Sequence, residues 1–209
     1  MNRRCGLFVV TFMFGFTSLC NAQTSSALRE RERVGSPADY RSLLQIAAVK
    51  KELAITPEQV KKLEEIFENA PSMAKASNKS AAMQKFEASL QETVNPNQWK
   101  RLVELRIQKA GSASLVREDV ATKLNLSEEQ LSDLQKLREK AISEAFSAGF
   151  KLGFRPGAPN PEDLKKSAAE RKDRQEKSLQ KGLEILTKEQ RDRFEQLRGK
   201  LFDFPDSDE

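Results

Sequence analysis

Four short polar motifs contain the residues whose types and spacing are best suited to chemistry in this chain. In each, a hydroxyl or amide side chain is followed three residues later by a glutamine. The pairs are Thr56 and Gln59, Asn95 and Gln98, Ser127 and Gln130, and Thr187 and Gln190. Because these side chains donate and accept hydrogen bonds, direct contact with a ligand is one interpretation. The other is that each motif starts a helix.

The motif that begins at Thr56 fits a helix start at every position. A hydroxyl at the N-cap accepts a hydrogen bond from the backbone N–H of Gln59, and the Gln59 side chain reaches back to the N–H of Thr56, which makes a capping box. Pro57 suits the first helical position, and Ile55 and Val60 can meet across the cap as a hydrophobic staple. We therefore favour helix capping over ligand contact for all four motifs.

The rest of the sequence offers little for catalysis or for a soft metal. The chain has no histidine, and its two cysteines, Cys5 and Cys20, both lie in the first 22 residues. Neither a nucleophile with its base nor a glycine-rich phosphate loop can be recognised. We expect no enzymatic activity, no cofactor and no metal site, because soft metals prefer histidine and sulfur ligands.

The first 22 residues have the pattern of a secretory signal peptide. A basic start, MNRR, precedes an apolar run at Gly6–Leu19, and Cys20-Asn21-Ala22 offers a small-x-small cleavage site. The apolar run is shorter than the about 20 residues that span a membrane. This pattern predicts an exported protein, periplasmic or extracellular, with no stable membrane insertion after cleavage; an uncleaved anchor is the alternative.

The charge of the chain gives no reason to expect a nucleic acid as partner. Thirty-six basic residues stand against 31 acidic ones, and the formal net charge is +5. Arg3 and Arg4 leave with the signal peptide, so the mature chain is only weakly basic. A single tryptophan and a single tyrosine leave little for stacking on bases.

Apolar spacing predicts an all-α fold. Apolar residues recur at three and four positions, as at Val60, Leu63 and Phe67 and again at Leu131 and Leu134. No stretch alternates long enough to suggest a strand.

An internal repeat organises the chain into two halves. Thr56 and Ser127 are 71 positions apart, whereas Asn95 and Thr187 are 92 apart, so the second half contains an insertion of 21 residues. We expect a flexible leader at 23–35, a first helical repeat at 36–111, a second at 112–204 with an inserted loop near 150–170, and an acidic tail at 205–209. Two tandem helical hairpins would then form a bundle or a curved cradle, packed on each other or on a second copy in a homodimer.

Aromatic residues gather before the predicted loop. Phe146, Phe150 and Phe154 recur every four residues, with Leu152 beside them. They form a candidate partner-binding patch, suited to gripping a protein partner or an unfolded client. The alternative is an extension of the core stripe that ends in a frayed helix. Gly149 and Gly153 favour a helix that ends here, since glycine costs about 1 kcal/mol relative to alanine inside a helix.

The four motifs, together with the signal peptide and the helical, cysteine-poor composition, resemble the LTxxQ-motif periplasmic family (Spy/CpxP-like), here with the motif-bearing unit duplicated. Only LTKEQ at Leu186–Gln190 matches the literal motif; ITPEQ and LSEEQ are conservative variants, and VNPNQ replaces the hydroxyl with Asn95. The resemblance covers about Ser36 to Phe204. It implies a curved helical cradle and a role as an envelope chaperone or stress-response adaptor.

These observations predict an exported, non-enzymatic helical binding protein, chaperone-like or an envelope-stress adaptor, whose partners are a protein or unfolded clients. One alternative is a structural or assembly component of the envelope with one dedicated protein partner. A second alternative is a metal-responsive sensor domain.

Overall fold

The computed structural model describes residues 36–72, 75–153 and 161–205, and this part of the chain is entirely helical apart from its connections. No strand occurs in these residues, so the predicted all-α fold is confirmed. The elements are α2 (Pro37–Gln45), α3 (Ala47–Glu52), α4 (Pro57–Glu68), α5 (Lys79–Thr93), α6 (Pro96–Ala110), the 3-10 helix η1 (Gly111–Ser114), α7 (Glu118–Leu124), α8 (Glu128–Gly153), α9 (Pro161–Ile185) and α10 (Lys188–Arg198). The predicted signal peptide and flexible leader lie outside the described residues, as do residues 206–209 of the predicted acidic tail.

Two hydrophobic clusters form the core, and α6 belongs to both. The first cluster is built by α2 to α6, with Leu102 and Leu105 of α6 at 0 % exposure. The second combines Ile107 of α6 with residues of α7, α8 and α10 and of the connection between η1 and α7, including Phe194 at 0 % exposure. Because one helix presents apolar residues to both clusters, α6 holds the two predicted halves together. The duplication itself remains a prediction.

The residues after α10 run back to the first cluster, and we call residues 199–205 the C-terminal strap. Phe202 and Phe204 pack against the first cluster. The backbone N–H of Phe202 donates to Oε1 of Gln108 at 2.9 Å, and Arg101 donates to the carbonyl of Lys200 at 2.6 Å. The strap thus connects the end of the predicted second half to the core of the first.

A glycine is required where the strap begins. Gly199 has a φ of +62°, and a Cβ atom built there would lie 2.3 Å from the Glu104 carboxylate. The positive φ strains any residue with a side chain, and a Cβ here would also force the flexible Glu104 carboxylate to move. Gly199 therefore ends α10 and turns the chain towards α6.

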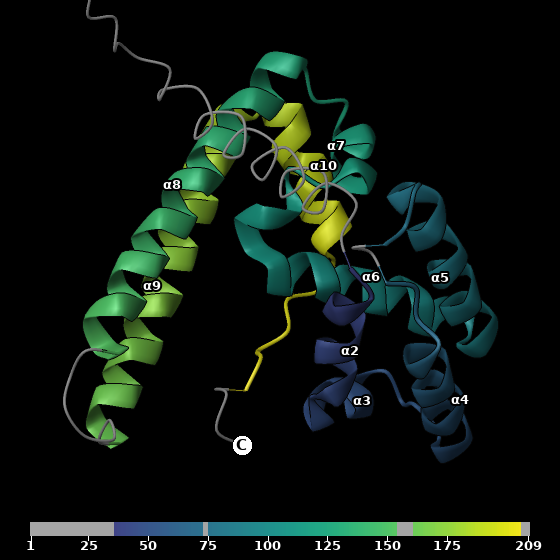
Figure 1. Cartoon of the computed structure of the whole chain (residues 1–209). Helices are drawn as coiled ribbons and strands as arrows, with labels where there is room; N and C mark the ends of the chain where they lie inside the picture. The colour runs from purple at the N-terminus through teal and green to yellow at the C-terminus, as the bar shows by residue number, and fades with distance from the viewer. Residues whose placement is uncertain (1–35, 73–74, 154–160, 206–209) are drawn as a thin grey trace, which may run out of the picture.

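Helices α8 and α9 form a long antiparallel hairpin, which we call the arm. Its base lies beside α7 and α10, and its tip points away from α4 and α5 (Figure 1). The base belongs to the second cluster, where Leu134 is buried and Leu179 and Leu183 pack against it. Further out, Ile142 is 49 % exposed.

The arm corrects the bounds of the predicted inserted loop. Helix α8 runs through Gly149 and ends at Gly153, the second glycine of the pair. One interior glycine costs about 1 kcal/mol, and the 26-residue helix tolerates it. Residues 150–153 and 161–170 are helical rather than loop, because Pro161 with Glu162 and Asp163 starts α9.

Candidate functional site

All four polar motifs have both hydrogen bonds of a capping box. At Thr56, Oγ1 accepts from the N–H of Gln59 at 3.2 Å and Oε1 of Gln59 accepts from the N–H of Thr56 at 3.0 Å. The same two bonds form between Asn95 and Gln98, between Ser127 and Gln130, and between Thr187 and Gln190. Each motif therefore starts the helix that follows it.

The glutamines of the first two motifs also bind each other. Nε2 of Gln59 donates to Oε1 of Gln98 at 2.8 Å, and Nε2 of Gln98 donates back to Oε1 of Gln59 at 3.1 Å. The remaining N–H of Gln98 reaches the carbonyls of Leu53 and Ala54 at 3.0 and 3.1 Å, and Gln59 reaches the carbonyl of Thr93 at 3.1 Å. Each glutamine thus caps its own helix and holds the chain before the other helix.

The third and fourth motifs repeat this arrangement. Gln130 and Gln190 exchange hydrogen bonds of 2.7 and 3.0 Å, and they also donate to the carbonyls of Ile185 and Asn125. Sequence reasoning missed these pairs, although a signal was present. A capping box accepts glutamate as well as glutamine, but only glutamine carries an N–H₂ group that can donate. All four motifs use glutamine.

Removing a capping hydroxyl tests the local role of the motifs. We expect Thr56→Ala and Ser127→Ala each to lower the free energy of unfolding by about 1 kcal/mol, because one N-terminal N–H loses its acceptor. Urea unfolding measures the loss. Ser42→Ala, which removes an exposed hydroxyl bonded to the Asp39 carbonyl inside a helix, serves as the control with little change. Equal stability of Thr56→Ala and the wild type would contradict the capping role.

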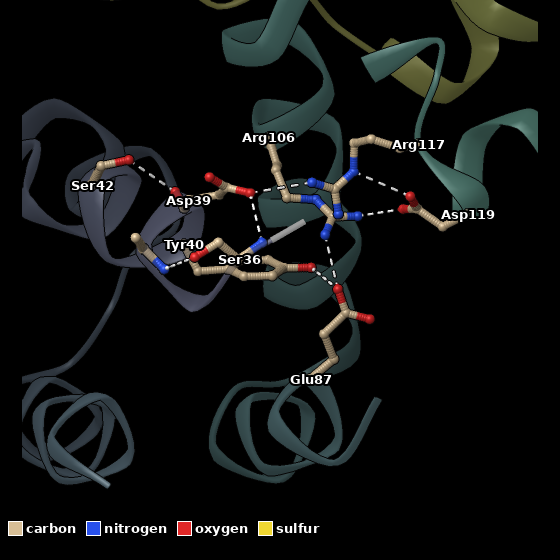
Figure 2. A network of polar contacts seen from close by, with 9 residues as sticks. Ser36, Asp39, Tyr40, Ser42, Glu87, Arg106, Arg117 and Asp119 are labelled. Atoms are coloured by element: carbon tan, nitrogen blue, oxygen red, sulfur yellow. Dashed lines mark hydrogen bonds and ion pairs between the residues drawn. The ribbon is translucent and has the colours of Figure 1, made fainter. Parts of the chain in front are cut away.

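A polar network that the sequence did not indicate lies between the two clusters (Figure 2). Arg106 of α6 is 4 % exposed and pairs with Glu87 of α5 at 2.8 Å and with Asp119 of α7. Its guanidinium stacks 4.7 Å from the ring centroid of Tyr40, whose hydroxyl donates to the same Glu87 oxygen at 2.7 Å. The network therefore ties α2 and α5 of the first cluster to α7 of the second.

Arg117, which precedes α7, extends the network. Its side chain is 6 % exposed, and it pairs with Asp39 of α2 and with Asp119, both at 3.2 Å. Burial raises the pKa of the Tyr40 phenol well above its usual 10.0. Tyr40 is 0 % exposed, so this phenol is closed to a substrate and we assign the network a structural role.

The carboxyl group of Asp119 makes the free energy of unfolding depend on pH in the acidic range. Burial acts to raise its pKa, but the charges of Arg106 and Arg117 outweigh burial and hold the pKa below its usual 3.8. A lowered pKa contributes stability that is present above 3.8 and is lost as the pH falls through the folded value. We expect the difference in unfolding midpoint between the wild type and Asp119→Asn to be constant above that pH and to shrink below it. A difference that persists unchanged in acid would contradict this linkage.

The predicted aromatic patch is only partly described. Phe146 lies on α8 and is 74 % exposed. The side chains of Phe150 and Leu152 and the whole of Phe154 lie outside the described residues, so the patch as a unit remains a prediction.

A groove of about 1040 Å³ runs along the arm, and we call it the arm groove. Helices α8 and α9 form its walls, and Ala110, Ser112 and Ala113 close it at the corner between α6 and η1. The wall from α8 supplies Leu137, Ala141 and Ile142. The wall from α9 supplies most of the basic side chains. The arm groove is larger than the pocket between α2 and α4, of about 380 Å³, and the pocket between α4 and α5, of about 720 Å³, and it is our candidate binding site.

The chain matches no protein-family model, no curated protein and no solved structure. The resemblance to the LTxxQ family therefore depends on the sequence features described above and remains a prediction. None of the described helices combines the length and apolar composition that crossing a membrane requires. Among the same residues, no three or more histidine, cysteine, aspartate or glutamate side chains gather to hold a metal ion.

Proposed function

We propose that this protein is an exported, non-enzymatic helical binding protein that acts on other proteins in a chaperone-like or stress-adaptor role. The observation that supports it best is the arm groove, which is open along a two-helix hairpin and carries an apolar side chain, Ile142, at 49 % exposure. A large concave surface with apolar contacts inside a charged rim suits weak and adaptable binding of protein segments.

The scaffold of the molecule also supports this role. The glutamine pairs, the Arg106 network and the strap hold the body together through side-chain contacts between distant parts of the chain. The arm leaves that body, so its outer part can contact a client without disturbing the core. The binding surface is therefore carried by the arm, while the contacts that stabilise the body do not depend on the outer part of the arm.

Aggregation assays on the mature chain test the proposal. We expect suppression of aggregation for several unrelated unfolding clients at near equimolar ratios, without added nucleotide. Ile142→Ser, which removes a half-exposed apolar side chain from the arm groove, should weaken that protection. Leu201→Ser is the matched control, because Leu201 is 65 % exposed and is not among the residues that line the groove. Protection of no client, with capture of a single partner, would favour a dedicated assembly component instead.

A further inference from the structure

An apolar stripe on α8 leaves the core and enters the arm groove. Leu134 is 2 % exposed and belongs to the second cluster. Leu137 and Ala141 follow at three and four positions and are half-buried, and Ile142 is 49 % exposed. Residues at this spacing share one face of a helix. The outer part of the stripe therefore faces an open groove with no third helix of the described chain across it.

Positive charge is concentrated around this stripe. Seven basic and three acidic side chains line the arm groove, a surplus of four in a chain whose formal net charge is +5. Five of the seven basic residues come from α9. Lys140, Lys166 and Lys181 form no ion pair with any described carboxylate and are exposed. The groove thus joins an apolar wall to a basic wall.

We propose, on the basis of the function proposed above, that the arm groove binds an acidic amphipathic helical segment of another protein. The apolar side of that segment lies on Leu137, Ala141 and Ile142, and its carboxylates face Lys166 and Lys181. An added helix is the element that covers an unpartnered helical stripe, and a helix in a groove is a common mode of peptide recognition.

Groove size and lining support a helix rather than a small molecule. Small-molecule pockets range up to about 1000 Å³, and the arm groove is at that limit and open along its length. Small side chains such as Ala113, Ala141 and Ser178 line it, and they let a helix backbone approach closely. Single exposed ion pairs contribute only about 0–1 kcal/mol. Recognition therefore requires several carboxylates together with the apolar contact.

Fluorescence anisotropy with a labelled peptide tests the proposal. The probe is a peptide of about 16 residues, near the length at which an isolated helix becomes stable in water, with leucines at i and i+4 and glutamates between them. We expect saturable binding to the full mature chain, and helix formation by the peptide in circular dichroism. Added salt should weaken binding, because exposed charges are screened beyond about 10 Å at 0.1 M ionic strength.

Charge reversal in the groove provides the decisive comparison. The triple variant Lys140→Glu, Lys166→Glu and Lys181→Glu should bind the peptide at least tenfold more weakly. The matched control is Lys51→Glu, Lys61→Glu and Lys62→Glu, which makes the same change in net charge at exposed positions on α3 and α4. The control should bind as the wild type does. Thermal melts confirm that both variants are folded.

Several outcomes would overturn the inference. Equal loss in both triple variants would mean that binding follows net charge and not this groove. If a polyglutamate peptide without leucines bound equally well, the proposed apolar contact with the groove would be wrong. If the protein bound anionic vesicles more tightly than the peptide, the partner would be a membrane surface. Concentration-dependent dimers that block the peptide, seen by light scattering, would make a second copy the occupant. If the protein protects clients but does not bind the peptide, only the inference about the groove is contradicted. If it binds the peptide but protects no client, only the chaperone role is contradicted.

Discussion

Arg106→Met is expected to lower the free energy of unfolding by about 3–5 kcal/mol, because it breaks a buried charge network from one side. The Arg106 side chain is 4 % exposed and pairs with Glu87 and Asp119. Without the guanidinium, both carboxylates lose their buried partner, and the Tyr40 ring loses the cation stacked 4.7 Å away. Urea unfolding of the variant measures the loss.

A second substitution separates the loss of charge pairing from the loss of packing. The variant Arg106→Met with Glu87→Gln and Asp119→Asn removes the uncompensated charges, and it should recover part of the stability. Arg174→Met is the matched control, because Arg174 is 36 % exposed and its pair with Glu170 is 3.8 Å long. Its expected cost is below about 1 kcal/mol. An equal cost for Arg106 and Arg174 would show that the network contributes no more than a surface pair.

Gln98→Glu is the second large effect, with an expected loss of about 2–4 kcal/mol. The glutamate keeps the oxygen that caps α6, but it cannot donate to the carbonyls of Leu53 and Ala54 or to Gln59. Those three acceptors would then face a negative charge at a site that is 8 % exposed. The substitution therefore separates capping from the bond between motifs.

The control for this experiment is Gln91→Glu, the same chemical change at an exposed position of α5. It should leave the unfolding midpoint nearly unchanged. If Gln98→Glu were as stable as Gln91→Glu, the glutamine pair would have no role beyond the capping box.

Local features of the fold could be predicted from the sequence because they depend on neighbouring residues. The all-α class follows from spacing at three and four positions, and the capping boxes follow from residues three apart. The sequence favoured a helix that ends at the pair Gly149 and Gly153, and α8 runs through the first of these glycines and ends at the second. The inserted loop was predicted near 150–170, although residues 150–153 and 161–170 are helical.

Contacts between residues far apart in the chain could not be predicted, because they produce no periodic pattern in the sequence. Arg106 and Arg117 look like ordinary charged residues, and only folding brings them to carboxylates on α2, α5 and α7. The glutamine pairs join residues 39 and 60 positions apart. The arm groove combines an apolar wall from α8 with a basic wall from α9, so neither helix alone reveals it. Sequence reasoning directed attention to Phe146 instead, on the same helix.

The C-terminal strap also determines when the molecule can finish folding. Phe202 and Phe204 cover a core that is otherwise built from residues 40 to 105. While a ribosome is still adding the last helices, that core lacks part of its cover, and Gln108 and Arg101 lack their partners on the strap. The first half therefore reaches its final form only after synthesis has passed residue 204.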